Sequence, residues 1–151
     1  MKTHGGFLSS RIKRIGDRIF EQMLSDSGVH AFNGAQGKIL YVLWERGEVS
    51  ISTIAQNTSL SKTSLTSMLD RMERGGLILR RQNPRSRREI LVSITEEARR
   101  LQAAYEAVSQ RINQVYYRGF RPEEIEQYEA YLARILANLE ECEKAHRRNE
   151  S

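Results

Sequence analysis

The stretch from Ser50 to Thr95 limits the possible folds of this 151-residue chain more than any other segment. Apolar residues recur at helical spacing on both sides of a short polar break at residues 57–61. This pattern predicts two short helices that meet at an angle and pack their apolar faces together. The residues expected in that shared core are Ile54, Ala55, Leu60, Leu65, Leu69 and Met72.

The second of these helices has a predicted start and a predicted end. Ser61 is suited to the N-cap, because its hydroxyl can accept a hydrogen bond from a backbone N–H of the first turn. Gly75 and Gly76 follow the last apolar position, and glycine readily adopts the left-handed backbone that ends many helices. We therefore expect a helix that begins at Lys62 and ends at this glycine pair.

The outward face of this helix is unusually rich in small hydroxyl side chains. Serine and threonine are mediocre helix formers, so their density here is a poor choice for stability alone. Short side chains let a helix approach base edges, and the longer Lys62 and Arg71 can reach phosphate or guanine. The alternative is a solvated helix surface. The candidate DNA-binding residues are Ser61, Lys62, Thr63, Ser64, Thr66, Ser67 and Arg71.

A β-hairpin is expected directly after the helix. Residues 77–81 and 89–94 are rich in branched apolar side chains, and Ile90, Val92 and Ile94 alternate as a single buried face requires. The Asn83-Pro84 pair between the two runs marks a turn.

The hairpin carries five arginines and no acidic residue between Arg80 and Arg88. Like charges at this density repel each other, so a polyanion is the expected compensation. Arginine at a hairpin tip can enter a narrow minor groove, and the candidates are Arg85, Arg87 and Arg88. The alternative is an exposed loop that charge keeps soluble.

The flanking segments have the pattern of long amphipathic helices. One apolar stripe from Leu8 to Met23 predicts a first helix, and Asn33 is a plausible N-cap for a second helix that ends near Gly47. Thr95 can cap a long helix whose apolar positions run from Leu101 to Val115. Gly119 interrupts it, and Pro122 suits the first turn of a last helix. That last helix has coiled-coil-like spacing, so these terminal helices favour a shared base between subunits.

Together these residues resemble the MarR-type winged-helix transcriptional regulators over nearly the whole chain. The most specific portion is Leu60–Ile78, followed by Asn83–Arg88 and Val92–Thr95. The resemblance implies a mainly α fold with a small β-hairpin wing, in a single domain over 1–151. Within it, about 33–95 is the winged helix-turn-helix DNA-binding lobe, and about 7–27 and 96–146 form the helical dimerisation region. It also implies a symmetric homodimer on a pseudo-palindrome of double-stranded DNA, with half-sites roughly 34–36 Å apart.

Two departures from the family pattern have physical meaning. Ser59 stands where the family usually has glycine, at a cost on the order of 1 kcal/mol if its φ is positive. In the wing, Ser86 and Asn83 stand where the family often has aspartate. The carboxylate expected to orient Arg88 is therefore missing, and Arg85 or Arg87 is an alternative groove-entering residue.

The resemblance further implies a small phenolic or amphipathic effector, bound between the dimer base and the DNA-binding lobe. We expect such a pocket to be lined by Phe32, Tyr41, Trp44 and Tyr105. Aromatic residues in such positions are more often simple core residues, which is the alternative for all four.

Composition excludes several other classes. The net charge is +5, no run of apolar residues approaches the length of a membrane span, and no secretory leader is recognisable, so a cytoplasmic location is expected. The single Cys142 lies on the apolar stripe of the last helix and is expected to be a small core residue. It lies four residues before His146, but no zinc-type cluster appears, and neither a metal nor a cofactor is expected.

No motif for catalysis stands out, and we expect no enzyme activity. Two function classes remain. The first is a dimeric, sequence-specific transcriptional regulator, a repressor released by a small ligand. The second is a non-catalytic winged-helix module that binds a protein partner or binds DNA without sequence preference.

Overall fold

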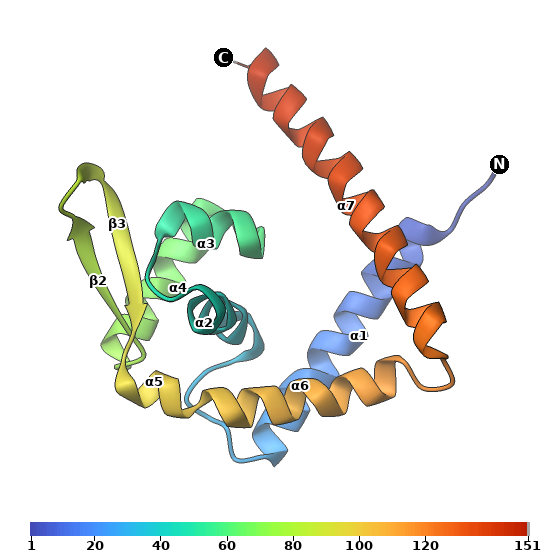
Figure 1. Cartoon of the computed structure of the whole chain (residues 1–151), viewed down its shortest axis with the longest axis horizontal. Coiled ribbons are helices and arrows are strands. Elements are labelled where there is room, and N and C mark those ends of the chain that lie inside the picture. The colour runs from blue at the N-terminus through green and yellow to red at the C-terminus, as the bar shows by residue number, and fades with distance from the viewer. Residues whose placement is uncertain (151) are drawn as a thin grey trace. The chain divides into compact units, whose positions relative to one another are not determined.

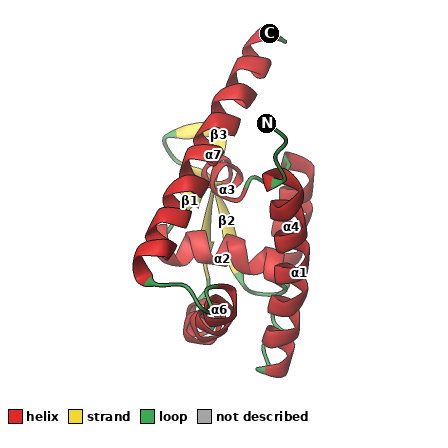
Figure 2. Ribbon diagram, turned by 90° about the vertical axis from the view of Figure 1, so that its right-hand side faces the viewer, coloured by secondary structure: helices red, strands yellow, loops and turns green. Residues whose placement is uncertain are grey.

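The computed structural model describes residues 1–150 and divides into two compact units, Met1–Ile112 and Asn113–Ser151 (Figure 1). The expected fold class is confirmed: the chain is mainly helical, with one small antiparallel sheet in the order β1-β3-β2 (Figure 2). In chain order the elements are α1 (Gly5–Asp26), α2 (Gly34–Arg46), β1 (Val49–Ser50), α3 (Ile51–Thr58), α4 (Lys62–Arg74), β2 (Ile78–Asn83), β3 (Ser86–Ile94), α5 (Glu96–Arg100), α6 (Gln102–Tyr116) and α7 (Pro122–Asn149).

The helix-turn-helix consists of α3 and α4, and serine side chains cap both helices. Ser50 Oγ accepts a hydrogen bond from the backbone N–H of Thr53, and Ser61 Oγ accepts one from that of Ser64 at 3.2 Å, as expected for an N-cap. At the end of α4 the residue with positive φ is Gly76, at +75°. Ser59 in the turn between the helices has a φ of +55°. This is the left-handed conformation for which the sequence predicts an energetic cost at a residue other than glycine.

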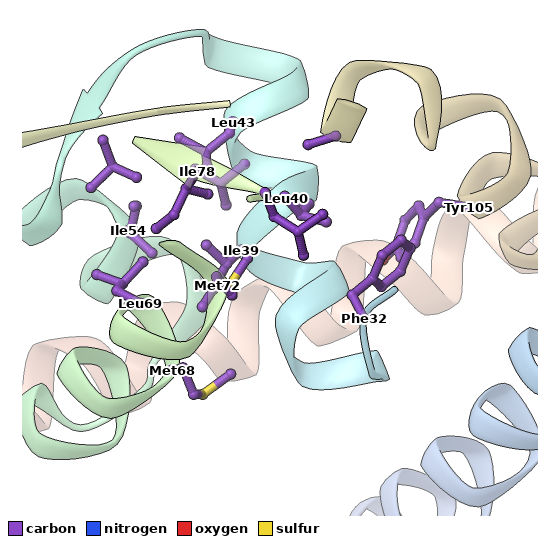
Figure 3. Close-up of a cluster of buried hydrophobic side chains, with 14 of the residues drawn as sticks. Phe32, Ile39, Leu40, Leu43, Ile54, Met68, Leu69, Met72, Ile78 and Tyr105 are labelled. Atoms are coloured by element: carbon purple, nitrogen blue, oxygen red, sulfur yellow. The ribbon is translucent and has the colours of Figure 1, made fainter. Parts of the chain in front are cut away.

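The core of the first unit lies where α2, α3 and α4 meet the sheet (Figure 3). Ile54, Leu65, Leu69 and Met72 are at most 1% exposed, as the apolar spacing predicted. Ala55 and Leu60 are only half-buried, because they lie at the margin of this core. From α2 and the sheet, the fully buried partners are Ile39, Leu40, Leu43, Ile78 and Val92.

The hairpin strands are longer than the apolar runs predicted, and Pro84 and Arg85 alone form the turn between them. The expected burial of Ile90 is wrong, since it is 44% exposed while Val92 is fully buried. Ile90 pairs with Gln82 in the outer half of the hairpin, next to the tip that protrudes from the lobe (Figure 1). The alternation of apolar residues therefore predicted the face of the strand on which Ile90 lies. It did not predict that the hydrophobic core ends before Ile90.

The helix expected to begin after Thr95 is divided into α5 and α6 at Leu101. Thr95 caps α5 as predicted, accepting from the backbone N–H of Ala98. The Ala98 carbonyl accepts the backbone N–H of Leu101 at 3.2 Å and the indole N–H of Trp44 at 3.1 Å. This tighter turn and the side-chain donor interrupt the regular helical pattern.

The apolar stripes of α1 and α7 are exposed. On α1, Phe7 is 65% and Leu8 51% exposed, and on α7, Ile135 is 53% and Leu139 63% exposed. None of the residues of α7 is buried. Within residues 1–150, no helix is both long and apolar enough to cross a membrane.

Candidate nucleic-acid interface

The outward face of α4 forms the first part of the candidate interface. All seven residues proposed for it are exposed. Several of their hydroxyls already have partners within the helix. Ser61 Oγ donates to Ser64 Oγ at 2.9 Å, and Thr66 Oγ1 donates to the Lys62 carbonyl at 2.9 Å. These three hydroxyls therefore stabilise the first turns of α4, which reduces their freedom to contact bases.

Ser67 and Arg71 form a small polar unit on the same face. Arg71 Nη2 donates to Ser67 Oγ, and Arg71 Nε donates to the Ser67 carbonyl, each at 3.4 Å. The guanidinium is thus held over Ser67, while the proton of the Ser67 hydroxyl stays free to donate. This arrangement suits a surface that offers both donors and acceptors.

Asp70 belongs to this face and was missed in the sequence. It follows Ser67 by three and Thr66 by four residues, so all three lie on one side of α4. Helical spacing alone places Asp70 on this face, but an acidic side chain is not expected on a surface that binds DNA.

Asp70 is paired with Arg80 at the base of the hairpin. Arg80 Nη2 lies 2.7 Å from Asp70 Oδ1 and 3.1 Å from Glu73 Oε1. The backbone N–H of Arg80 also donates to Glu73 Oε2 at 2.9 Å. Hydrogen bonding to Arg80 holds the pKa of Glu73 below its usual value, and the same bond raises the pKa of Arg80.

The neighbouring Arg81 is paired as well, on the opposite face of the sheet. Its guanidinium donates to both oxygens of Glu48, at 2.7 and 3.0 Å, which lowers the pKa of Glu48. The interpretation of five uncompensated arginines is therefore wrong for two of them. Arg80 and Arg81 lie at the base of the hairpin, where two carboxylates of the preceding helix α4 neutralise Arg80 and Glu48 neutralises Arg81.

The tip keeps three arginines, Arg85, Arg87 and Arg88. All three are exposed, and none has a carboxylate partner among residues 1–150. The three arginines lie close together in sequence around the hairpin turn. They therefore concentrate positive charge that neighbouring carboxylates do not offset.

Asn83 braces this tip in place of the aspartate expected from the family pattern. Its Oδ1 accepts from the backbone N–H of Arg85 at 3.0 Å, and its Nδ2 donates to Glu89 Oε2 at 2.6 Å. Gln82 Nε2 donates to the Arg87 carbonyl at 2.9 Å. The two amides order the backbone of the turn and leave the three guanidinium groups unbound.

The four aromatic residues expected around an effector do come together. Tyr105 is the centre, with ring-centroid distances of 5.2 Å to Trp44, 6.0 Å to Phe32 and 6.3 Å to Tyr41. Gly37 makes this packing possible, because a Cβ there would lie 2.7 Å from the Tyr105 ring. Burial raises the pKa of the Tyr105 phenol.

A cavity of about 350 Å³ lies beside this aromatic cluster, with Phe32 as its one member in the lining. The other lining residues lie between Glu21 and Gln36, on α1, α2 and the loop that joins them. Tyr41 is 49% exposed, whereas Phe32 is 4% and Tyr105 9% exposed.

Cys142 is exposed on α7 within the described chain, so its expected place in a core is not observed. Its Sγ lies 3.6 Å from His146 Nδ1. Among residues 1–150, no group of three or more His, Cys, Asp and Glu side chains is placed to hold a metal ion.

Comparison with known proteins adds to this geometry. The model of the MarR family matches residues 32–90, from the loop before α2 to the second strand of the hairpin. The Bacillus subtilis HTH-type transcriptional regulator YkoM is 27% identical over 72% of this chain and 71% of its own length. The Escherichia coli homoprotocatechuate degradative operon repressor is 29% identical over 72% of this chain and 73% of its own length.

Solved structures share the fold. A MarR variant from E. coli, in complex with operator DNA, superposes with a TM-score of 0.78 at 24% identity, over 87% of this chain and 92% of that one. BpsR of Bordetella bronchiseptica, whose DNA binding is regulated by 6-hydroxynicotinic acid, gives a TM-score of 0.76 at 24% identity, over 89% of this chain and 99% of that one.

The capped helix pair α3–α4 and the basic hairpin define a winged helix-turn-helix of the DNA-binding class. Residues 32–90 match the MarR family, and the curated relatives that cover 72% of this chain include an HTH-type transcriptional regulator and an operon repressor.

Proposed function

We propose that this protein is a homodimeric repressor that binds a pseudo-palindromic operator and is released from it by a small molecule. The observation that carries the proposal is the pairing of two surfaces in one lobe: the hydroxyl-rich face of α4 and the three unpaired arginines of the hairpin tip. A hydroxyl-rich helix face can read base edges, and unpaired arginines are attracted to phosphates and to narrow minor grooves.

In this proposal α4 lies in the major groove. Ser67 and Arg71 are the principal base-reading pair, because the hydroxyls of Ser61, Ser64 and Thr66 are already engaged within the helix. Thr63, on the same face, supplies a further free hydroxyl, and Lys62 at the start of α4 contacts phosphate. Arg85, Arg87 and Arg88 lie along the adjacent minor groove or its phosphates.

Dimerisation through α1 and α7 is supported by their exposed apolar stripes. A monomeric soluble protein rarely exposes several large apolar side chains along one stripe, and a second copy would bury them. The dimer would hold two α4 helices about one turn of DNA apart, roughly 34–36 Å.

Repression and effector release are supported by the relatives. One is named as a repressor of a degradative operon, and another is regulated by 6-hydroxynicotinic acid. An effector of this aromatic kind would bind at the aromatic cluster or in the adjacent cavity of about 350 Å³. It would lower DNA affinity by preferring a different separation of the two α4 helices.

The test is fluorescence anisotropy with a duplex taken from directly upstream of the protein's own gene and a shuffled duplex of equal composition. We expect a preference of about a thousandfold or more for the upstream duplex at near-physiological salt. Equal affinity for both duplexes, with a steep dependence on salt, would mean that the protein is a basic DNA-binding module without sequence preference. Absence of binding to either would favour a protein partner for the winged helix.

Substitutions distinguish the contributions of the hairpin tip and of the α4 face to DNA binding. Replacing Arg87 and Arg88 with glutamine should weaken binding to both duplexes and flatten the salt dependence. Ser67→Ala should instead reduce the preference for the upstream duplex. Equal losses on both duplexes for Ser67→Ala would contradict base reading by α4.

For the effector, calorimetry with 6-hydroxynicotinic acid and homoprotocatechuate is the direct measurement. We expect binding heat from at least one aromatic acid and release of DNA by the same compound. Absence of heat and of release for both would remove this part of the proposal.

A further inference from the structure

Arg80 stands out because it joins the two DNA-facing parts of the lobe. Its guanidinium contacts two carboxylates of α4, Asp70 at 2.7 Å and Glu73 at 3.1 Å, while its own backbone belongs to β2. The side chain is 22% exposed, which makes it the least exposed arginine in any ion pair that the structure records among residues 1–150.

The two carboxylates lie where negative charge opposes DNA binding. Asp70 follows Thr66 and Ser67 on the outward face of α4, and its side chain is 48% exposed. Glu73 follows Asp70 by three residues and is 37% exposed. A phosphate backbone that approached α4 would be repelled by both groups at the range of a Debye length.

We infer that Arg80 is a positioning residue for DNA binding, which neutralises Asp70 on the face of α4 and holds the hairpin base against that helix. This inference rests on the proposed function. Arg80 itself does not contact DNA, but it makes the acidic part of the α4 face compatible with a phosphate backbone.

A second physical consequence is geometric. The Arg80 backbone N–H and guanidinium both donate to Glu73, at 2.9 and 3.1 Å, so the strand and the helix are joined at two points. The hairpin that carries Arg85, Arg87 and Arg88 begins at this junction. Its direction relative to α4 is therefore fixed at the end nearest the helix.

The experiment compares four forms of the full chain on the upstream duplex: wild type, Arg80→Gln, Arg81→Gln, and Arg80→Gln combined with Asp70→Asn and Glu73→Gln. Arg81→Gln is the matched control. It removes the same charge from the next residue and leaves one carboxylate, Glu48, on the opposite face of the sheet.

We expect Arg80→Gln to weaken binding about tenfold or more, and Arg81→Gln to change it by less than about threefold. The defect of Arg80→Gln should shrink between about 50 mM and about 300 mM salt, because salt screens the repulsion by the carboxylates. The triple variant should recover most of the lost affinity, since the repelling charges are gone. A merely structural role for Arg80 would leave the defect of Arg80→Gln independent of salt.

Wild-type affinity for Arg80→Gln, or a triple variant as weak as Arg80→Gln, would overturn the inference. Thermal unfolding of each form verifies that the variants are folded at the temperature of the titration. If the wild type itself binds no duplex, the proposed function fails first. If it binds and Arg80→Gln binds equally well, only the inference about Arg80 fails.

Discussion

Ser59 is the residue at which local strain is most clearly visible. It is the one residue other than glycine with positive φ within residues 1–150, at +55°, and it lies in the turn between α3 and α4. A side chain in this region costs on the order of 1 kcal/mol. The structure thus has the backbone of a glycine turn with a serine in it.

We predict that Ser59→Gly raises the melting temperature by about 1–2 °C, because the extra freedom of glycine in the unfolded chain offsets only part of the strain that is removed. Calorimetry measures the shift. Ser61→Ala is the control of opposite sign, since loss of the α4 N-cap should destabilise the protein by about 1 kcal/mol. A lower melting temperature for Ser59→Gly would show that serine is the better residue in this turn.

The helix caps are predictable from the sequence, whereas the ion-pair partners of the hairpin arginines are not. Ser61, Asn33 and Thr95 were predicted as caps, and each accepts the expected backbone hydrogen bond. The partners of Arg80 and Arg81 were not predicted. Glu48 is 33 residues from Arg81 in sequence, so only the packed fold brings this pair together.

At the scale of elements, the corner between α6 and α7 has its own polar cluster. Tyr117 donates to Glu129 at 2.7 Å, and the hydroxyls of Tyr116 and Tyr128 lie 2.9 Å apart. Burial, together with these hydrogen bonds, raises the pKa of Tyr116 and of Tyr117 to about 12. Both phenols are therefore neutral in the folded protein at a pH where free tyrosine ionises.

This shift predicts a loss of stability at alkaline pH. Because the folded pKa lies above the unfolded value of 10.0, the contribution is complete below pH 10 and is lost as pH rises toward 12. Urea unfolding at about pH 9 and about pH 11 should show a decrease for the wild type. Tyr117→Phe should show a smaller decrease, by on the order of 1 kcal/mol or less after solvent screening. Identical decreases for both proteins would contradict the prediction.

The elements themselves were largely predictable, for a physical reason. Helical spacing, caps and glycine stops are local signals, and they predicted α1, α2, α4, α7 and the hairpin. The division at Leu101 depends on the Trp44 indole, 54 residues from Ala98, and the exposure of Ile90 depends on where the covering helices end. Both are consequences of tertiary packing, which single-sequence patterns do not contain.

At the scale of the whole molecule, the central proposal is a dimer formed through the exposed stripes of α1 and α7. Leu139, at 63% exposure, lies within the α7 stripe. Leu139→Glu would place a charge in the proposed interface, where it would be desolvated without a partner.

We predict that Leu139→Glu shifts the protein from dimer to monomer in light scattering, and weakens operator binding by at least about tenfold, because two linked lobes bind more tightly than one. Ala137→Glu is the matched control, since it adds the same charge on the opposite side of α7, about 200° around the helix from Ile135. Its dimer and its affinity should be unchanged. A dimeric Leu139→Glu protein would place the interface elsewhere.

The most direct test of the whole account is the spacing of the operator. Once the protected sequence in the upstream duplex is known, anisotropy is measured on it and on a duplex with about five base pairs inserted between the half-sites, which turns one half-site to the opposite face of the DNA. If the protein is a symmetric dimer with two fixed α4 helices, its affinity for the inserted duplex should fall to its affinity for shuffled DNA. Equal affinity for the original and inserted duplexes would contradict a paired reading of two half-sites.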